Sequence, residues 1–287
     1  MTSAQIVAGS IANGQKVRTY ELTYPRFIHS EIMTHRMFSR NAASSRAIPI
    51  SKMLESLVLD PEDLFERLGL NQSGMQAQEI QLNESELAGF RNSFREYRNK
   101  LLRMAEDCVT INLHKQIANR FLEPLMHMTS IVTATDMGNF FAQRCHPDAQ
   151  PELQSLAFKM LKCELDYEFK KMNYGQWHLP YVTLEEKKAW SFRELRKMSV
   201  ARVASVSYIK HGEELTKERC YAIFDKLLNG GHWSPFEHVC TPMAPNNKDH
   251  YSGNLKGWSM FRKEFMSECR DVVDLEALYN TKPEWIK

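Results

Sequence analysis

The stretch THRMFSRNAASSRAIP, residues 34–49, concentrates polar chemistry within a short segment. It holds one histidine, three arginines, three serines and one asparagine, and it ends at a proline. Arginine supplies a planar, permanently charged fork that suits phosphate oxygens, and serine adds short hydroxyl donors. Such a stretch is typical either of a solvated basic turn or of a loop that binds phosphate groups, and its residues alone leave both interpretations open.

The bulk composition limits the class of protein. Of 287 residues, 43% are apolar, and 37 Lys and Arg against 35 Asp and Glu give a net charge of +2. This balance argues against a protein that coats nucleic acid, which would be far more basic.

The six cysteines form no CxxC pair, which favours a reducing compartment. The N-terminus lacks the features of a signal peptide, and no run approaches the ~20 apolar residues of a membrane span. We therefore expect a cytoplasmic protein.

The hydrophobic pattern predicts more helix than strand. A strand is expected at 16–25, followed by a short helix at 27–37, so that the quoted stretch lies at the end of this helix and in the loop after it. Longer helices are predicted at 87–111, at about 151–172 and at about 216–229, and a further strand at 237–245. The expected fold is α+β, with long helices packed on a small, mostly antiparallel sheet.

Each of the three long helices has an apolar stripe that we expect to face inward. In the first, the stripe is Leu87, Phe90, Phe94, Tyr97, Leu101, Met104, Cys108 and Ile111. In the second, it is Leu153, Leu156, Met160, Leu161, Leu165 and Phe169. In the third, it is Cys220, Ile223, Phe224, Leu227 and Leu228. A linker near 173–190 would separate a first half, 1–172, from a second half, 191–287, which together are expected to form one intertwined catalytic domain.

Three further segments hold residues of chemical interest. Arg120 and Arg144 stand among apolar residues, where an arginine needs a ligand or an ion pair, for example with Glu123 or Asp148. The segment GGHWSPFEHV, 230–239, could pack on a flat ring and cap a phosphate. Its His-Glu-His spacing fits no familiar zinc pattern, so no metal is expected. Cys145 is next to His146 in sequence, but neighbouring residues of a helix point about 100° apart, so we interpret it as a half-buried cysteine and not as a nucleophile.

Taken together, these segments resemble the flavin-dependent thymidylate synthase family. The family signature is Arg-His-Arg, seven residues and then Ser, and Thr34-His35-Arg36 with Ser44 occupies that place. The fuller pattern of Ser, Asn, Ser and Arg is matched by Ser39, Asn41, Ser44 and Arg46. The family's other elements are similar to Arg120-x-x-x-Pro124, to NFFAQRCHPDAQPEL at 139–153, to SVSY at 205–208 and to HWSPFEH at 232–238.

This sequence also departs from the family pattern. Thr34 replaces the first arginine of the signature, Ala42 a glutamate, Ala47 a tyrosine, and Glu31 a glutamine. The SPFEH element follows the signature here, whereas it precedes the signature in typical members. The segment NLKGWSMFRK, 254–263, is similar to a degenerate second copy of the helix that leads into the signature. The resemblance therefore implies a divergent, rearranged member of the family.

The resemblance implies an enzyme that uses FAD and NADPH to transfer a one-carbon unit from methylenetetrahydrofolate to C5 of dUMP, giving dTMP. It implies self-association as a dimer or tetramer with sites shared between chains, and no nucleic-acid polymer or membrane as partner. By position, the residues expected to hold FAD are His35, Arg36, Ser39, Asn41, Asn139, Ser207, His232 and Ser234. Those expected at the nucleotide are Glu31, Ser44, Arg46, Arg120 and Arg144, with Arg144 and Ser44 as the catalytic pair.

Two alternatives follow from the departures. The same fold could act on dCMP or leave a hydroxymethyl group, because the Glu31 carboxylate can accept a hydrogen bond from a cytosine amino group and would repel the O4 atom of uracil. The loss of the first arginine and of the glutamate could instead indicate a nucleotide or flavin binder without catalytic activity.

Overall fold

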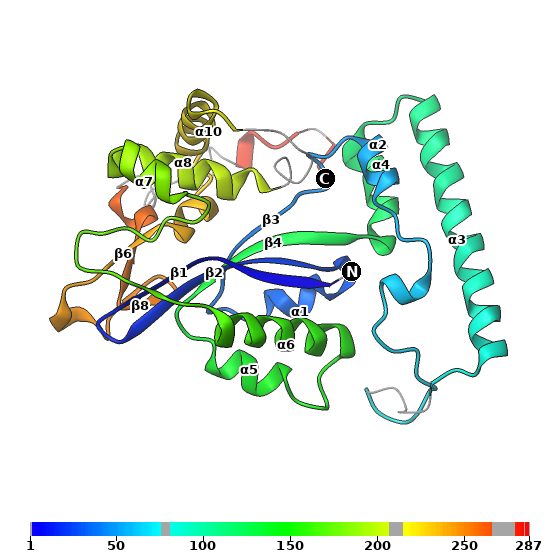
Figure 1. Cartoon of the computed structure of the whole chain (residues 1–287). Helices are drawn as coiled ribbons and strands as arrows, with labels where there is room; N and C mark the ends of the chain where they lie inside the picture. The colour runs from blue at the N-terminus through cyan, green and yellow to red at the C-terminus, as the bar shows by residue number, and fades with distance from the viewer. Residues whose placement is uncertain (1, 76–80, 207–214, 266–278, 284, 287) are drawn as a thin grey trace.

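The computed structural model describes residues 2–75, 81–206, 215–265, 279–283 and 285–286. A five-stranded sheet with strand order β3-β4-β2-β1-β5 lies at the centre of these residues (Figure 1). β1, Ser3–Ala12, and β2, Gln15–Pro25, form an antiparallel hairpin. Asn13 and Gly14 at its turn have φ values of 50° and 78°, which asparagine and glycine tolerate best. The predicted strand at 16–25 is thus confirmed.

The other strands extend this hairpin on both sides. β4, His127–Ala134, runs antiparallel to β2 and to the short edge strand β3, Ser39–Ala42. β5, Lys170–Lys171, is parallel to β1 on the far edge. The sheet is therefore small and mostly antiparallel, and with the helices around it the expected α+β class is confirmed.

The helices α5, Gly138–Arg144, and α6, Pro151–Asp166, cover one face of the sheet. Tyr20 and Leu22 of β2 pack there against Leu153 and Leu156 of α6 in a fully buried cluster. Alternate residues of a strand point to the same face, which explains why these two β2 residues share this cluster.

The helix α6 ends at Asp166, six residues before the predicted end at 172, because the chain becomes extended at Tyr167 and turns towards β5. The Tyr167 hydroxyl accepts a hydrogen bond of 3.1 Å from the backbone N–H of Gly9. As a result Leu165, which was predicted to face inward, is 77% exposed, and Phe169 lies beyond the helix.

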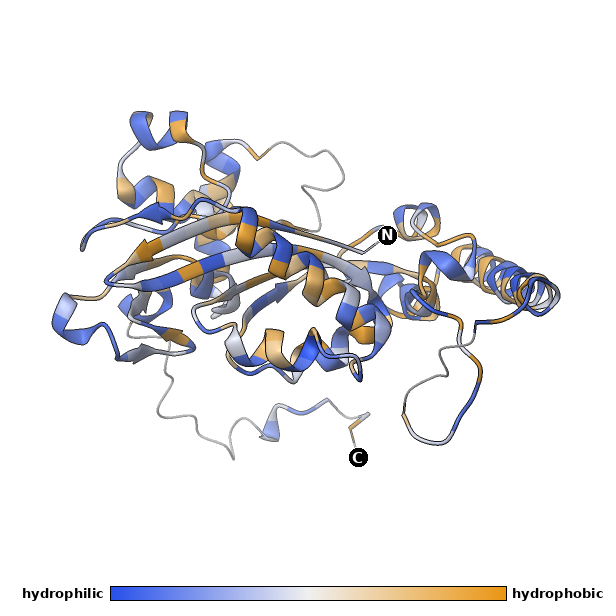
Figure 2. Ribbon diagram, turned by 60° about the horizontal axis from the view of Figure 1, so that its bottom comes forward, coloured by the Kyte–Doolittle hydropathy of each residue, from blue (hydrophilic) through white to orange (hydrophobic). Residues whose placement is uncertain are grey.

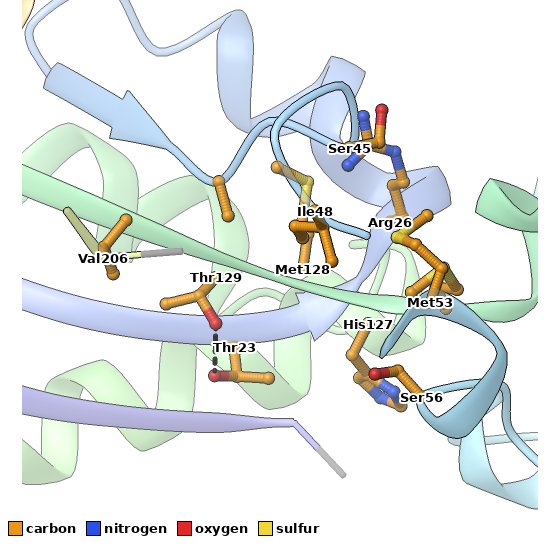
Figure 3. A pocket seen from close by; sticks show the side chains of 12 residues that line it. Thr23, Arg26, Ser45, Ile48, Met53, Ser56, His127, Met128, Thr129 and Val206 are labelled. Atoms are coloured by element: carbon orange, nitrogen blue, oxygen red, sulfur yellow. Dashed lines mark hydrogen bonds between the residues drawn. The ribbon is translucent and has the colours of Figure 1, made fainter. Parts of the chain in front are cut away.

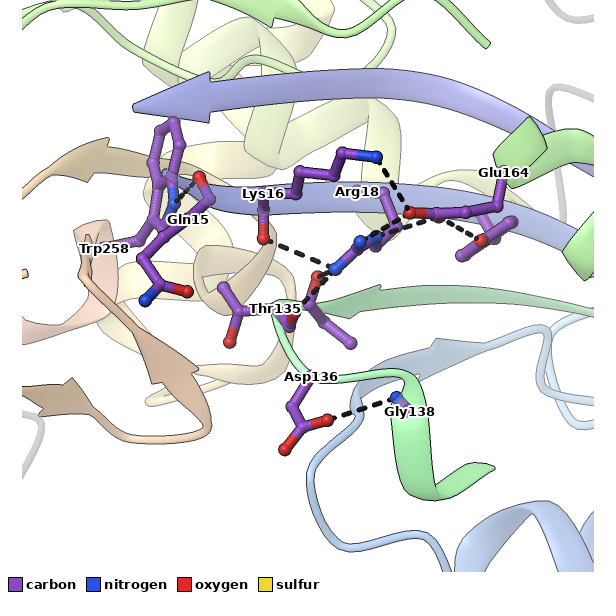
Figure 4. Close-up of polar contacts among 10 residues, drawn as sticks. Gln15, Lys16, Arg18, Thr135, Asp136, Gly138, Glu164 and Trp258 are labelled. Carbon is purple, nitrogen blue, oxygen red and sulfur yellow. Dashed lines mark hydrogen bonds and ion pairs between the residues drawn. The ribbon is translucent and has the colours of Figure 1, made fainter. Parts of the chain in front are cut away.

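An ion pair joins the end of α6 to the sheet (Figure 4). Arg18 donates hydrogen bonds from Nε and Nη2 to the two carboxylate oxygens of Glu164, at 3.0 and 2.6 Å. Its Nη1 donates to the carbonyl oxygen of Thr135 at 2.6 Å, and the Tyr20 hydroxyl donates to Glu164 at 2.9 Å. Because both charged side chains are mostly buried, these bonds satisfy groups that could not remain unpaired there.

The C-terminal part of the chain covers the opposite face (Figure 1). Its helices are α7, Leu184–Ala189, α8, Phe192–Ala204, α10, Lys217–Asn229, and the 3₁₀ helices η4, Ser234–His238, η5, Pro245–Asn247, and η6, Phe261–Glu264. Its strands are β6, Cys240–Pro242, β7, Tyr251–Ser252, β8, Leu255–Lys256, and β9, Trp258–Met260. α10 confirms the helix predicted at about 216–229. The strand predicted at 237–245 is confirmed only for the three residues of β6, because its first two residues belong to η4 and its last residue begins η5. Leu195, Phe224 and Phe236 are buried together in this part.

A third group of elements lies at the other end of the sheet. It comprises α2, Ile50–Glu55, η2, Pro61–Asp63, α3, Glu84–Thr110, α4, Lys115–Leu122, and η3, Glu123–Leu125. α3 confirms the long predicted helix and forms the outer margin of the molecule (Figure 1).

Only part of the α3 stripe faces inward. Phe94, Leu101 and Cys108 are buried, whereas Phe90, Tyr97, Met104 and Ile111 are 37%, 44%, 39% and 70% exposed. The prediction that the whole stripe is inward is wrong for these four, because α3 packs on the molecule along one narrow line. Figure 2 shows hydrophobic residues interspersed with hydrophilic residues along α3.

The predicted division of the chain into two halves around 173–190 stays a prediction. Part of that segment, from residue 184 to 189, is the helix α7. His178 lies within it and is hydrogen-bonded to Ser10 and Thr19 of the first half. None of the helices in the described residues is long and apolar enough to cross a membrane.

Candidate functional site

The stretch 34–49 lies between two short helices and contains a strand. It follows η1, Arg26–Ile28, and α1, His29–Met33, contains β3, and leads into α2. The expectation that it is all helix end and loop is wrong for residues 39–42, because β4 offers them a strand partner. Ser39 is buried on β3, its hydroxyl has no hydrogen-bond partner, and it lines none of the cavities described below.

The loop 43–49 is held from behind by Ser45. The buried Ser45 hydroxyl donates a 2.5 Å hydrogen bond to Glu123, and the Asn119 side chain donates to the carbonyl oxygens of Ser45 and Ile48 at 2.7 and 2.9 Å. This anchoring leaves the neighbouring side chains of Ser44 and Arg46 exposed on the other side of the loop.

Glu123 also pairs with two arginines. Arg26 lies 3.1 Å from one of its oxygens, and Arg120 lies 3.1 Å from the other. Arg120 thus makes the ion pair with Glu123 that the sequence left open as an alternative, and its side chain is 54% exposed instead of lying on an apolar helix face.

A cavity of about 220 Å³ lies behind the same loop (Figure 3). Thr23 and Thr129, which are hydrogen-bonded at 3.4 Å, line it together with Met53 and His127. Burial lowers the pKa of His127 to about 4, so this imidazole is neutral at pH 7. None of the predicted site residues lines this cavity.

The largest of the three cavities described here is a cleft of about 1120 Å³. It brings together five residues that were predicted from the sequence: Asn41, Ser44, Arg46, His232 and Ser234. Four polar residues of its lining were not predicted as site residues: Gln116 of α4, Ser205 at the end of α8, and Arg219 and Lys226 of α10. None of the described residues that line the cleft carries a carboxylate, while Arg46, Arg219 and Lys226 are cationic.

Hydrogen bonds fix the two predicted segments to each other in this cleft. The Ser234 hydroxyl lies 2.9 Å from the carbonyl oxygen of Arg40 and 3.2 Å from Oδ1 of Asn41. The Asn41 amide donates to the carbonyl oxygen of Val203 at 2.8 Å. β3, η4 and the end of α8 therefore meet at one point, although they are far apart in sequence.

A buried polar chain supports η4 from below. Ser10 contacts Nδ1 of His178 at 2.9 Å, and Nε2 of His178 contacts Thr19 at 2.9 Å. Thr19 contacts Thr133 at 2.7 Å, and Thr133 contacts Nδ1 of His238 in η4 at 2.8 Å. Burial lowers the pKa of each histidine to about 3, so both imidazoles are neutral.

A second, smaller cavity of about 170 Å³ holds four other predicted residues, His35, Arg36, Asn139 and Arg144. Nε of Arg144 donates a 3.0 Å hydrogen bond to Nε2 of His35. Burial, and then the positive charge of Arg144, lower the pKa of His35 to about 4, so this nitrogen is available as an acceptor. The small cavity and the cleft share no lining residue.

The remaining predictions lie elsewhere. Glu31 of α1 is half-buried and accepts a 2.9 Å hydrogen bond from Ser30. Ser207 lies outside the described residues. Cys145 is half-buried, as predicted, and burial raises the pKa of its thiol. His146 is instead 3.6 Å from Asp148.

The segment 230–239 does not form a metal site in this structure. Glu237 pairs with Arg262 at 2.5 Å, while His238 is buried against Thr133 and His232 lines the cleft. Across the described part of the chain, no three His, Cys, Asp or Glu side chains come together as metal ligands would.

Comparison with known proteins identifies the family. The model of the thymidylate synthase complementing protein family matches residues 15–165, which include the stretch 34–49, Arg120 and Arg144. No curated protein matches the chain. Two crystal structures of the UMP/dUMP methylase PolB from Streptomyces cacaoi are similar to it, one bound with 5-Br UMP and one with 5-Br dUMP. Their sequence identities are 14% and 13%, each has a TM-score of 0.45, and the matches cover 57% of this chain and 88% and 90% of those chains. Because the family model covers more than half of its length, this chain belongs to the thymidylate synthase complementing protein family, the flavin-dependent thymidylate synthases.

Proposed function

We propose that the protein transfers a one-carbon unit from methylenetetrahydrofolate to C5 of dUMP and reduces it to a methyl group, giving dTMP. FAD, when bound, carries reducing equivalents from NADPH to the transferred carbon. Membership of the family supports this reaction. The observation that carries the proposal is the single basic cleft lined by residues from both the 34–49 stretch and the 230–239 segment.

The chemistry of the cleft fits phosphorylated ligands with flat rings. Ser44 and Arg46 offer a hydroxyl and a guanidinium to a nucleotide phosphate. Trp233 offers an aromatic face, and His232 and Ser234 lie beside it on the flavin side. Asn41 is a further ligand for the cofactor in this proposal, whereas Ser207, Glu31 and Arg120 are assigned by resemblance alone.

Arg144 has an electrostatic role in this proposal. C5 of a pyrimidine is a weak nucleophile until negative charge builds on the ring, and a guanidinium held against the ring oxygens stabilises that charge. Its Nε–H bond to the neutral His35 fixes the orientation of the fork. Its role is to orient the ring and stabilise charge and not to act as a base, because a guanidinium offers only hydrogen-bond donors.

The separation of Arg144 from Arg46 in two cavities supports a site shared between chains. In this proposal the small cavity of one chain meets the cleft of another in a dimer or tetramer. The exposed apolar side chains Phe90, Tyr97 and Met104 on α3 support self-association, because such a row is stabilised when a second chain covers it.

The test is turnover of the full chain with FAD, NADPH and methylenetetrahydrofolate, offered dUMP and dCMP in parallel reactions. We expect methylated product from dUMP. The Glu31 side chain, whose oxygens can accept a hydrogen bond from a cytosine amino group, favours a second candidate in which dCMP is the substrate. Product from dCMP alone, or a hydroxymethyl product, would select that candidate, and binding of both ligands without turnover would contradict an enzyme.

A further inference from the structure

Arg144 is bonded to an imidazole and not to a carboxylate. Its Nε atom donates a 3.0 Å hydrogen bond to Nε2 of His35, and both side chains are half-buried. Arg18 and Arg120 differ from it, because each pairs with a glutamate, at 2.6 and 3.1 Å. Among the residues that the structure describes, no carboxylate forms an ion pair with Arg144. Its positive charge is therefore not offset by a bonded anionic side chain.

His35 is itself held by its surroundings. Its ring lies edge-to-face with the ring of Phe140 in α5, at a centroid distance of 4.9 Å, and 5.6 Å from the ring of Phe38. Both phenylalanines are almost fully buried. The carbonyl oxygen of His35 accepts hydrogen bonds from the backbone N–H of Phe38 at 3.1 Å and from Nη1 of Arg40 at 3.3 Å. The imidazole is therefore a fixed acceptor for Arg144.

This hydrogen bond requires a neutral imidazole. A guanidinium only donates, so Nε2 of His35 must be without a proton, and Nδ1 carries it. Burial, and then the charges of Arg144 and Arg40, lower the pKa of His35 to about 4. The other charged side chains that line the small cavity are Arg36 and Asp136, and the Asp136 carboxylate accepts a 3.2 Å hydrogen bond from a backbone N–H of its own turn. His35 is therefore neutral at pH 7.

A neutral acceptor and a carboxylate leave different electrostatics for a ligand. A carboxylate would fix the guanidinium but would also offset its charge, and a paired charge stabilises a developing anion less well. An imidazole fixes the direction of the Nε–H group and adds no negative charge. Orientation and full charge are thus combined in Arg144.

We propose that His35 is a positioning residue for Arg144, which orients the guanidinium through a neutral acceptor and so leaves its whole charge for the negative charge that develops on the pyrimidine ring. This inference rests on the proposed function for the identity of the ring. It differs from the expectation that His35 holds FAD, because it assigns the imidazole to carbon transfer and not to cofactor affinity. The hydrogen bond can be tested without turnover, so the two proposals can fail separately.

The kinetic experiment measures carbon transfer to dUMP in single turnovers of the full chain, saturated with reduced FAD. His35→Phe removes the acceptor and keeps a ring, His35→Gln keeps a neutral acceptor, and His35→Glu keeps an acceptor but adds a negative charge. His146→Phe is the matched control, because His146 is exposed just beyond α5 and does not line the small cavity. The FAD dissociation constant and the thermal unfolding of each variant are measured in parallel.

We expect His35→Phe and His35→Glu to slow carbon transfer about 10²-fold, the scale of a misplaced or offset catalytic group, and His35→Gln to restore most of the rate. FAD dissociation constants, and the rate of His146→Phe, should stay at wild-type values. In the Arg144→Ala background, His35→Phe should slow transfer no further, because the two side chains act as one unit.

Four results would overturn the proposal. These are transfer at the wild-type rate in His35→Phe, equal rates in His35→Glu and His35→Gln, a further loss from His35→Phe in the Arg144→Ala background, and a loss of FAD affinity as large as the loss of rate. The last result would make His35 a cofactor ligand.

Nitrogen NMR of isotope-labelled histidine tests the hydrogen bond without turnover. At pH 7 the wild-type His35 signals, identified by their loss in His35→Phe, should show a proton on Nδ1 and none on Nε2. Arg144→Ala should raise the pKa of His35, because it removes a donor to the neutral ring and a nearby positive charge. An unchanged titration would overturn the proposal. The expected titration without any methylated product would contradict the proposed function and leave the contact of His35 with Arg144 standing.

Discussion

Arg40 and Arg46 belong to the same short stretch but have different surroundings. Arg40 donates from one nitrogen to the carbonyl oxygens of Ile32, Met33 and His35, at 3.2, 2.7 and 3.3 Å. It therefore closes the end of α1, whose last carbonyl groups have no partner within the helix. Arg46 is exposed and lines the cleft. The Arg40 guanidinium thus acts on the protein itself, whereas the Arg46 guanidinium faces the cleft.

A substitution of Arg40 should lower stability, whereas a substitution of Arg46 should weaken ligand binding. Arg40→Met should lower the free energy of unfolding by about 2 kcal/mol, because the carbonyl groups of α1 lose a charged donor. Arg46→Ala should leave stability nearly unchanged and weaken dUMP binding by about 2 kcal/mol. Urea unfolding and calorimetric titration of both variants measure the two effects. Equal loss of stability in both would show that Arg46 is structural.

Arg144→Ala should lower carbon transfer by about 10²–10³, the usual effect of removing one preorganised donor from a charge that develops in the transition state. Reduction of FAD by NADPH should stay near the wild-type rate, because that half-reaction does not involve the pyrimidine. Stopped-flow measurement of each half-reaction separates the two. Arg144→Lys should restore little, since a point charge cannot replace the fork. Carbon transfer at the wild-type rate in Arg144→Ala would show that this arginine only orients His35.

Sequence motifs that resemble those of the family predicted part of the candidate site. Ser44, Arg46, His232 and Ser234 were named from their motifs, and they line one cleft. Lys226 could not be found in this way. It lies on a regular amphipathic helix, and sequence spacing shows which residues share a face but not which distant loop that face meets.

At the scale of the elements, the contact of α6 with the sheet depends on one carboxylate. Glu164 receives hydrogen bonds from Arg18 and Tyr20, and its side chain is 12% exposed. A buried charge that loses its partner is costly, because solvent cannot replace the lost interaction. The end of α6 should therefore be sensitive to a substitution that barely changes its shape.

Glu164→Gln should lower the free energy of unfolding by about 3 kcal/mol, because Arg18 would keep its charge and lose its carboxylate partner. Glu168→Gln is the matched control, because Glu168 is exposed just beyond the same helix. Urea unfolding of both variants measures the difference. A loss below about 1 kcal/mol for Glu164→Gln would mean that water or Thr135 compensates the guanidinium.

The elements that could be predicted were those with a clear period. The 3.6-residue stripe predicted α3, and the alternation at 16–25 predicted β2. β4 is buried on both faces, so its residues do not alternate, and it was not predicted. β1 was also missed, although the Asn13-Gly14 pair at its end is a hairpin signal. The exposed half of the α3 stripe could not be foreseen, because periodicity does not show how much of a stripe is covered.

At the scale of the whole molecule, mixing of two inactive variants tests whether sites are shared. If Arg46 of one chain and Arg144 of another act together, a mixed dimer of Arg46→Ala and Arg144→Ala contains one site with both arginines intact. Random reassociation should then restore about a quarter of the wild-type activity, because half of the dimers are mixed and half of their sites are complete. Activity of the refolded mixture measures this. Activity no higher than that of either variant alone would place both arginines of a site in the same chain.

Stability should fall in mild acid because of the buried histidines. His178 and His238 have pKa values lowered by burial to about 3, against 6.5 in the unfolded chain. Below pH 6.5 the unfolded state binds protons that the folded state does not, so each histidine should cost about 1.4 kcal/mol per pH unit as the pH falls. Urea unfolding between pH 6.5 and 5 measures the slope, and His238→Gln should reduce it by one proton. A flat profile in this range would contradict the neutral, buried state.

The polar chain beneath η4 also constrains where its protons can be. Thr19 and Thr133 each have a single hydroxyl proton, and one of them donates to the other. If Thr19 donates, Thr133 must give its proton to Nδ1 of His238, and Nε2 of His178 must supply a proton to Thr19. If Thr133 donates, both relations reverse. When every hydroxyl proton is used, His178 and His238 therefore adopt the same tautomer, and a change at one ring inverts the direction of every hydrogen bond as far as the other.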